Sequence, residues 1–216
     1  MSIKTCRQQF FTNGFTRLSR TMDDRGGADH RSELLGHVNG VVVEVGAGAG
    51  ASFAHYGPGV EVVYAIEPSA SLRSIAQATA GRSGVTIVLA DGTGDSLPVE
   101  TASCDWAVCS LVLCSVPDQL STLAEIARVL KPGGRLAFYE HVRSERPALA
   151  RVEDILTPPW SALAGGCHLN RATLESISQA GFEIEDARRF GFSPFPGSPR
   201  VAHIAGTARL RSRDDR

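Results

Sequence analysis

Residues 41–50 read Val-Val-Val-Glu-Val-Gly-Ala-Gly-Ala-Gly, a β-branched run that ends in alternating glycines. Such a run predicts a buried parallel strand, and the glycines predict a tight turn directly after it. Gly46, Gly48 and Gly50 remove side chains where a ligand has to approach the backbone. We therefore expect a ligand at this turn, close to the Glu44 carboxylate, which suits a ligand ammonium group. A strand-to-helix turn without a ligand is the alternative.

The acids that follow the next two predicted strands bear on which ligand binds. Glu67 ends a strand at 61–66, lies 19 positions after Gly48 and precedes Pro68. A carboxylate placed there is suited to accept hydrogen bonds from both ribose hydroxyls, and the alternative is a surface acid at a strand end. Asp91-Gly92-Thr93 ends a strand at 85–90. Asp91 would accept from an adenine amine, or else it only forms a turn before glycine.

The alternation of elements along the chain predicts the fold class. We expect further strands at 105–111 and 135–139, helices at 70–80 and 119–130, and two last strands at 182–189 and 201–208, paired antiparallel at the sheet edge. This pattern predicts an α/β fold: a Rossmann-like, doubly wound, mainly parallel seven-stranded sheet with an antiparallel edge strand. Residues 148–156 are expected to form a helix that stops before Pro158, and Asn170 is expected to cap a helix at 171–180.

Size and charge limit the functions that are open to this chain. Its 216 residues fit one domain, which we place at 39–208, followed by a disordered tail at 209–216. Lys and Arg number 22 against 23 Asp and Glu, giving a net charge of -1. Proteins that bind a nucleic-acid backbone carry an excess of Lys and Arg over Asp and Glu. This chain has no such excess, so we expect no nucleic-acid partner.

The cysteines indicate a reduced protein without a metal. The chain has five cysteines, an odd number, and their spacing is not that of a small disulfide-linked domain. Residues 1–15 contain no continuous apolar region of the kind found in a secretion signal. Both features favour a cytoplasmic location. Cys104, Cys109 and Cys114 are five positions apart, which matches no usual zinc spacing, so we expect no metal site.

Two apolar segments are candidates for lining the substrate site. Residues 1–38 are expected to form an N-terminal helical segment whose apolar stripe packs on the core or closes over the ligand as a lid. In the lid arrangement, Phe15 and Met22 face the ligand. Residues 190–199 hold three phenylalanines and three prolines, including Phe195. This loop is either a substrate wall or a hydrophobic cover over the sheet edge.

Five motifs follow one another in order: residues 44–50, Glu67-Pro68, Asp91-Gly92, Asp105 with its strand, and residues 130–134 (Leu-Lys-Pro-Gly-Gly). In this order they resemble the motifs of class I S-adenosylmethionine-dependent methyltransferases, over residues 35–208. Within that superfamily, residues 111–116, 128–134, 140–142, Trp160 and 166–171 are similar to small methyltransferase-like proteins that methylate alkyl thiols. Residues 143–165 match only loosely, and the hydrophobic anchoring segment of the mammalian relatives is missing, so we expect no membrane anchor.

The resemblance implies the cofactor, S-adenosyl-L-methionine, and roles for individual residues. Glu44 with Gly46, Ala47, Gly48 and Gly50 would hold the methionine part, Glu67 and Pro68 the ribose, and Asp91, Gly92 and Thr93 the adenine. Cys109, Ser110 and Leu111 would lie beside the sulfonium. His141 is the first candidate for a catalytic base and His168 a weaker second. Together with Phe15, Met22 and Phe195, His168 would also contact a small-molecule acceptor.

Two other functions remain compatible with the sequence. The glycines partly match the dinucleotide fingerprint, with Ala51 at its last position, so a nicotinamide-dependent oxidoreductase is one alternative. An oxidoreductase of this kind would leave the role of Asp91 unexplained. A protein that binds S-adenosylmethionine without turnover is the other. The acceptor atom and the oligomeric state are not predicted.

Overall fold

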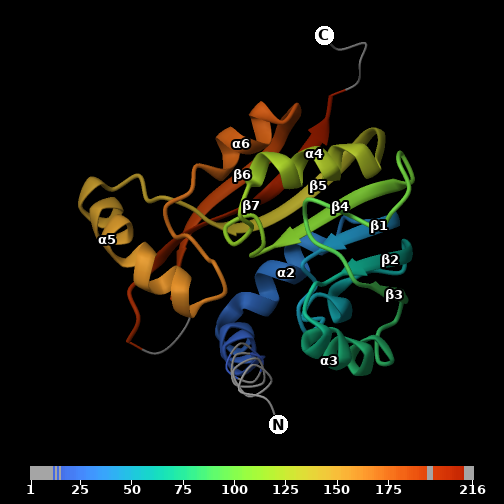
Figure 1. Cartoon of the computed structure of the whole chain (residues 1–216), viewed down its shortest axis with the longest axis horizontal. Coiled ribbons are helices and arrows are strands. Elements are labelled where there is room, and N and C mark those ends of the chain that lie inside the picture. The colour runs from blue at the N-terminus through green and yellow to red at the C-terminus, as the bar shows by residue number, and fades with distance from the viewer. Residues whose placement is uncertain (1–11, 13, 15, 194–196, 212–216) are drawn as a thin grey trace.

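The computed structural model describes residues 12, 14, 16–193 and 197–211, apart from the side chain of Leu163. Its seven strands form one sheet in the order β3-β2-β1-β4-β5-β7-β6 (Figure 1). Strands β1 to β5 pair in parallel, whereas β7 is antiparallel to both β5 and β6. The strands are β1 (Gly40–Val45), β2 (Val60–Ile66), β3 (Thr86–Ala90), β4 (Cys104–Ser110), β5 (Leu130–His141), β6 (Phe182–Phe192) and β7 (Val201–Leu210). The predicted fold class is confirmed. The antiparallel strand is β7, which lies next to the edge strand β6 and not at the edge itself.

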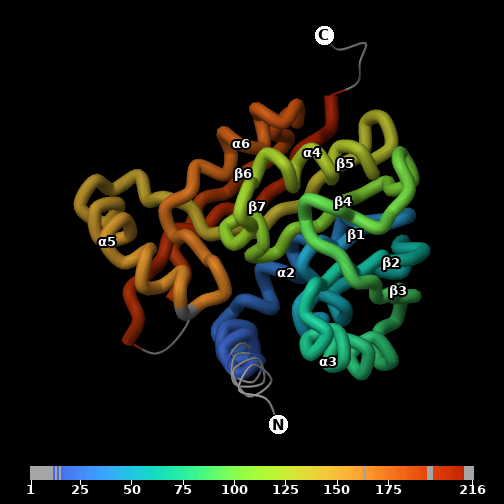
Figure 2. Tube along the Cα trace, viewed as in Figure 1, coloured from blue at the N-terminus to red at the C-terminus, as the bar shows by residue number. Residues whose placement is uncertain are grey.

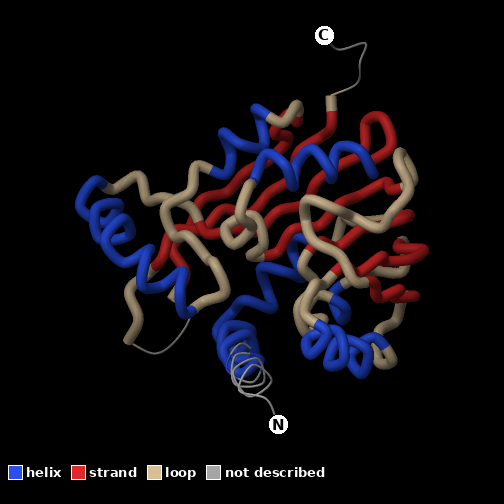
Figure 3. The backbone as a smooth tube through the Cα atoms, viewed as in Figure 1, coloured by secondary structure: helices blue, strands red, loops and turns tan. Residues whose placement is uncertain are grey.

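Helices cover both faces of the sheet (Figure 3). Alternate side chains of β1 enter two separate cores, because successive residues of a strand point to opposite faces. Val43 packs with Leu123 and Ile177 under α4 and α6, whereas Val42 packs with Leu35 under α2 and α3. The helical elements are η1 (Asp23–Gly27), α2 (Ala28–Leu35), η2 (Phe53–His55), α3 (Ala70–Ala80), α4 (Gln119–Val129), α5 (Pro147–Leu163) and α6 (Thr173–Gln179).

The N-terminal segment, blue in Figure 2, leads into α2 on the same face of the sheet as α3. Gly26 bends this segment with a φ of 108°, so that η1 and α2 follow one another across a kink. In the part of the chain that the structure describes, no helix is long and apolar enough to cross a membrane.

Helix α5 is longer than the sequence predicts, because it continues through Pro158 and Pro159 to Leu163. Each proline lacks an amide hydrogen and so leaves one carbonyl without its helical donor. Here the helix lies at the periphery of the molecule (Figure 1), where water reaches such carbonyls, and Ile155 is 73% exposed. The rule that two prolines end a helix therefore failed at an exposed position.

Three further boundaries differ from the prediction. Asn170 does not cap α6, which begins at Thr173, because its side-chain amide donates to Asp154 Oδ1 at 3.0 Å. Strand β5 begins at Leu130 rather than at Arg135, and residues 131–134 form an irregularity inside it. Strand β7 continues to Leu210, and Arg209 and Leu210 therefore belong to the sheet rather than to a tail.

Candidate active site

A cavity of about 100 Å³ lies at the carboxyl ends of β1 and β4, beside the glycine turn. Several residues predicted to bind the ligand line it, and so do residues of the N-terminal segment that the sequence did not single out. The lining consists of Leu18, Ser19, Met22, Arg31, Glu44, Gly46, Ala47, Gly48, Ala51, Ser52, Ser110 and Leu111. A larger cavity of about 290 Å³ lies elsewhere, between residues 144–149 and the ends of β6 and β7. It contains none of the predicted donor-binding residues.

The glycines of the turn are required by its backbone geometry. Gly46, Gly48 and Gly50 have φ values of 66°, 57° and 82°, a region that side chains disfavour. A Cβ atom on Gly46 would lie 2.7 Å from a methyl group of Val112, and one on Gly50 would lie 2.6 Å from the ring of Phe53. Gly50 therefore packs against Phe53 and does not line the cavity.

Glu44 is the buried acid of the cavity wall, with 2% of its surface exposed. Its Oε2 accepts a hydrogen bond from the Tyr56 hydroxyl at 2.9 Å. Burial raises the pKa of Glu44 to about 7, against the opposing effects of hydrogen bonds from Ser52 and Tyr56 and of the Arg31 charge. Arg31 is also buried and forms an ion pair with Asp23. The cavity therefore holds a carboxylate and a guanidinium close to each other.

Glu67 is fixed at the turn by backbone amides. Its Oε2 accepts from Gly48 N at 2.9 Å and its Oε1 from Ser69 N at 2.8 Å. Because each carboxylate oxygen has two lone pairs, one acceptor position on each oxygen stays available to a ligand. Burial raises the pKa of Glu67 despite these two bonds. The neighbouring Pro68 is exposed.

Asp91 lies at the rim of the site and does not line the cavity. Its carboxylate pairs with Arg73 at 2.7 Å, and the same guanidinium donates to the Glu67 carbonyl at 2.5 Å. Gly92 is close-packed, since a Cβ there would lie 2.8 Å from a methyl group of Ile66. Thr93 is exposed and bridges to Ser96.

The end of β4 forms the opposite wall of the cavity. Ser110 Oγ is buried and, among the described residues, has no hydrogen-bond partner. Leu111 has a φ of 60°, which is strained for a leucine, and such residues cluster at functional sites. Cys109 is fully buried within the strand and does not line the cavity, and burial raises the pKa of its thiol far above the ordinary value. The unpartnered hydroxyl of Ser110 is suited to bind a polar ligand group.

Glu140 holds the loop that follows β4, a role that the sequence did not predict. Its Oε1 accepts from Val112 N and Leu113 N, both at 2.9 Å, and its Oε2 accepts from Cys114 N at 3.0 Å. The side chain is 0% exposed. One carboxylate therefore fixes three successive amides next to the cavity wall.

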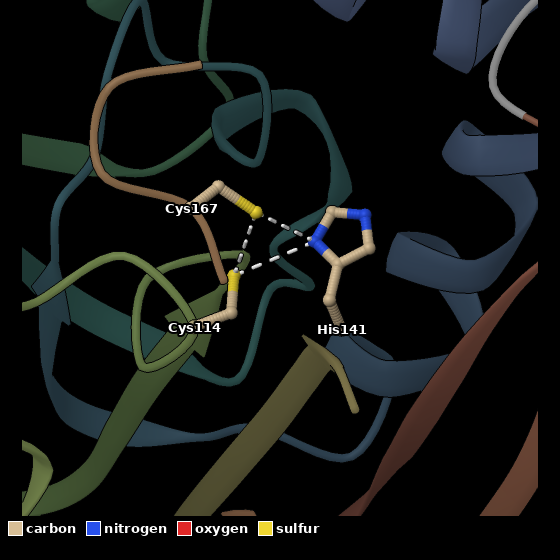
Figure 4. A group of neighbouring side chains, drawn as sticks. All are labelled: Cys114, His141 and Cys167. Carbon is tan, nitrogen blue, oxygen red and sulfur yellow. Dashed lines mark hydrogen bonds between the residues drawn. The ribbon is translucent and has the colours of Figure 1, made fainter. Parts of the chain in front are cut away.

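His141, predicted as the catalytic base, meets two cysteines from distant parts of the chain (Figure 4). Its Nδ1 lies 3.4 Å from Cys114 Sγ and 3.3 Å from Cys167 Sγ, and the two sulfurs are 3.7 Å apart. The hydrogen bond between the two sulfurs lowers the pKa of Cys167, whereas burial raises the pKa of Cys114. The Nδ1 atom thus faces two sulfur atoms rather than the donor cavity.

The geometry can now be compared with known proteins. Residues 43–138 match the family model described as a methyltransferase domain. Thiol S-methyltransferase TMT1B of Rattus norvegicus is 34% identical over 182 residues, which cover 82% of this chain and 73% of the relative. The chain belongs to the class I S-adenosylmethionine-dependent methyltransferases. Its cofactor is accordingly S-adenosylmethionine, and the nicotinamide alternative is not favoured.

A second relative and two solved structures are also similar to this methyltransferase, the latter in fold. Thiol S-methyltransferase TMT1B of Homo sapiens is 29% identical over 225 residues, covering 96% of this chain and 91% of the relative. An S-adenosylmethionine-dependent methyltransferase of Mesorhizobium loti has the same fold, with a TM-score of 0.62 and 21% identity over 87% of this chain and 99% of the other. Geranyl diphosphate methyltransferase also has it, with a TM-score of 0.66 and 14% identity over 85% of each chain.

The predicted acceptor-binding residues of the methyltransferase are only partly placed. Met22 lines the donor cavity, whereas Phe15 and Phe195 lie outside the described residues. His168 lines neither cavity, and its Nδ1 lies 2.6 Å from the Gly166 carbonyl oxygen. The acceptor side of the site therefore stays a prediction.

Proposed function

We propose that this methyltransferase transfers the methyl group of S-adenosylmethionine to the sulfur of a small-molecule thiol. Binding of the donor is supported by the cavity beside the glycine turn, where buried Glu44 and Arg31 meet the Ser110 hydroxyl, which has no hydrogen-bond partner among the described residues. The thiol acceptor is supported by the TMT1B relatives, which are named thiol S-methyltransferases and align over most of this chain. A cytoplasmic location stays a prediction.

The donor would lie with its methionine part in the cavity. Glu44 matches the ammonium group, and Arg31 matches the carboxylate, for which its guanidinium has a fitting geometry. Glu67 would accept from the ribose hydroxyls, with the adenine toward Asp91, Gly92 and Thr93 at the rim. Leu18, Ser19 and Met22 line the cavity from the N-terminal segment, which supports its assignment as a lid over the methionine end.

The reaction is an in-line displacement at a methyl group that the sulfonium already activates. A lone pair of the acceptor thiolate forms the new S–C bond while the S–C bond to the donor sulfur breaks. The electron pair of that bond stays on the donor, giving S-adenosylhomocysteine and a thioether. Because a free thiol has a pKa of about 8.5, only modest help is needed to ionise it. Positioning of the reactants can contribute up to about 7–11 kcal/mol in favourable cases.

The function is tested by supplying S-adenosylmethionine with a tritiated methyl group and matched acceptors that differ in one atom. An alkyl thiol, the corresponding alcohol and the corresponding amine are compared under the same conditions. We expect label in the thioether and none in the ether or the methylamine. Labelling of the alcohol or amine with the thiol left untouched contradicts the proposal.

Replacing Glu67 with alanine should weaken the binding of S-adenosylhomocysteine by about 1–3 kcal/mol, because hydrogen bonds to a charged acceptor are lost. Isothermal titration calorimetry measures the effect. Glu61→Ala is the matched control, since Glu61 is an exposed acid on β2, the strand that directly precedes Glu67. Unchanged affinity in the Glu67 variant would remove the ribose assignment.

Affinity for S-adenosylhomocysteine should fall below neutral pH, because Glu44 has a pKa of about 7 and a ligand ammonium favours its ionised form. The ionised fraction drops about tenfold between pH 8 and pH 6, which corresponds to about 1.4 kcal/mol. Calorimetry across this range, on the native chain and on Glu44→Gln, separates the residue from the ligand's own ionisation. Equal pH dependence of the two proteins would show that Glu44 does not contact the ammonium.

A further inference from the structure

Cys114, His141 and Cys167 come from three segments that meet at one point (Figure 4). Cys114 lies in the loop after β4, His141 ends β5, and Cys167 follows α5. Their exposed fractions are 0%, 7% and 6%. Two thiols and an imidazole nitrogen face one another here, in a region with little access to water.

The spacing of the three atoms is that of ligands around one tetrahedral ion. Zinc binds sulfur at about 2.3 Å and histidine nitrogen at about 2.0–2.1 Å. With tetrahedral angles, these bond lengths put two sulfurs about 3.8 Å apart and a sulfur and a nitrogen about 3.6 Å apart. The corresponding distances are 3.7 Å between the sulfurs and 3.4 and 3.3 Å from the sulfurs to Nδ1. Binding an ion would require shifts of only a few tenths of an ångström.

The backbone holds the two cysteine loops together independently of the sulfur contacts. Cys114 N donates to Glu140, and the Cys114 carbonyl accepts from His168 N at 2.8 Å. Gly166 has a φ of 90°, and a Cβ on it would lie 2.9 Å from the Ser115 carbonyl oxygen. The loop that carries Cys167 is therefore packed directly on the loop that carries Cys114.

We propose that Cys114, Cys167 and His141 bind one zinc ion through two thiolates and Nδ1. This ligand set is soft and borderline, which suits zinc and disfavours magnesium or calcium. Among the described residues, the group of potential ligand atoms contains these three side chains and no fourth. Three protein ligands leave one tetrahedral position for an exogenous ligand, as in catalytic zinc sites. His141 is then a metal ligand and not the general base predicted from the sequence.

We assign the fourth position to the acceptor sulfur, an assignment that rests on the proposed thiol methylation. Leu111 lines the donor cavity and also packs against the buried cluster that contains Cys114 and Cys167, so the zinc site adjoins the donor site. The acceptor binds zinc as a thiolate, having left its proton in bulk water before it enters the site. Its free lone pair attacks the methyl group, the donor S–C bond breaks toward the donor sulfur, and the neutral thioether leaves as a weak ligand.

The first experiment measures metal binding without any reaction. The reduced full chain is equilibrated with zinc, separated from loosely bound metal and analysed for zinc per chain, with its affinity measured against a chromogenic chelator. We expect one zinc per chain. Cys114→Ser, Cys167→Ser and His141→Asn should each weaken binding at least about hundredfold. Cys104→Ser, a buried cysteine at the other end of β4, should bind as the native chain does.

Cobalt substitution in the native chain supplies a readout that needs no variant to fold. A thiolate-to-cobalt charge-transfer band is expected, and removal of the metal by a chelator should abolish it reversibly. Failure of the reduced native chain to retain zinc would overturn the site, as would equal retention by Cys114→Ser and Cys167→Ser. A native chain that forms a Cys114–Cys167 disulfide and binds no metal after reduction would also overturn it.

The second experiment tests the fourth position separately. Propane-1-thiol is added to the cobalt-loaded chain without S-adenosylmethionine, and propan-1-ol serves as the control. A third thiolate should raise the charge-transfer intensity by about half, whereas the alcohol should leave it unchanged. An unchanged spectrum with the thiol would overturn the substrate-binding role. Metal and thiol binding without methyl transfer to any thiol would refute the proposed function and leave the zinc site standing.

Discussion

Replacing Glu140 with alanine should lower the free energy of unfolding by about 3–5 kcal/mol, the largest effect expected from a single side chain of the site. The substitution removes the acceptor of three backbone amides, at Val112, Leu113 and Cys114. Each buried donor left unsatisfied costs about 1–3 kcal/mol, and movement of the loop recovers part of this. Denaturant-induced unfolding, followed by circular dichroism, measures the change.

Two further variants of the same type test the cause. Glu140→Gln keeps an oxygen that accepts from Val112 N and Leu113 N but places an amide group against Cys114 N. Its free energy of unfolding should therefore fall less than that of Glu140→Ala. Glu183→Ala removes an exposed acid from β6 and should change stability by less than about 0.5 kcal/mol. If glutamine were as costly as alanine, the charge rather than the number of hydrogen bonds would decide the effect.

Replacing Gly46 with alanine should reduce the free energy of unfolding by about 2–5 kcal/mol and weaken the binding of S-adenosylhomocysteine. The left-handed backbone costs an L-residue about 1–2 kcal/mol. The added Cβ would lie 2.7 Å from a Val112 methyl group, and overpacking of this kind costs about 1–3 kcal/mol. Because the residue lines the donor cavity, calorimetric binding and thermal unfolding should both change.

The contact with Val112 and the backbone strain are separable. In the Gly46→Ala, Val112→Ala double variant the clash is relieved, so part of the loss should be recovered while the cost of the backbone conformation stays. Gly57→Ala is the control, because no atom lies within 4 Å of its added Cβ and its φ is not positive. A Gly57 variant as damaging as Gly46→Ala would contradict this explanation.

Much of the fold was accessible from the sequence because its signals are local. The β-branched run before Gly46 predicted β1, and the helix predicted at 70–80 has the observed bounds of α3. Predictions failed where solvent exposure or a contact with another segment overrode a local sequence rule. Pro158 continues a helix in an exposed position, and Asn170 hydrogen-bonds to another segment instead of capping α6.

The site was predicted less completely, because its remaining parts depend on contacts between distant residues. Cys114 and Cys167 are 53 positions apart, so no spacing rule along the chain reveals that they meet at His141. Arg31 enters the donor cavity only because the N-terminal segment folds over the end of β1. Arg31 lies nine positions after Met22, the last residue of the apolar stripe, and nothing in the sequence signals that its side chain reaches the cavity.

A crystal structure with S-adenosylhomocysteine bound tests the central claim most directly. We expect the ribose hydroxyls within hydrogen-bond distance of the Glu67 carboxylate and the amino-acid part in the cavity beside Glu44 and Ser110. The sulfur should lie close to Leu111. A ligand bound elsewhere, or bound at this turn without contact to either acid, would contradict the account.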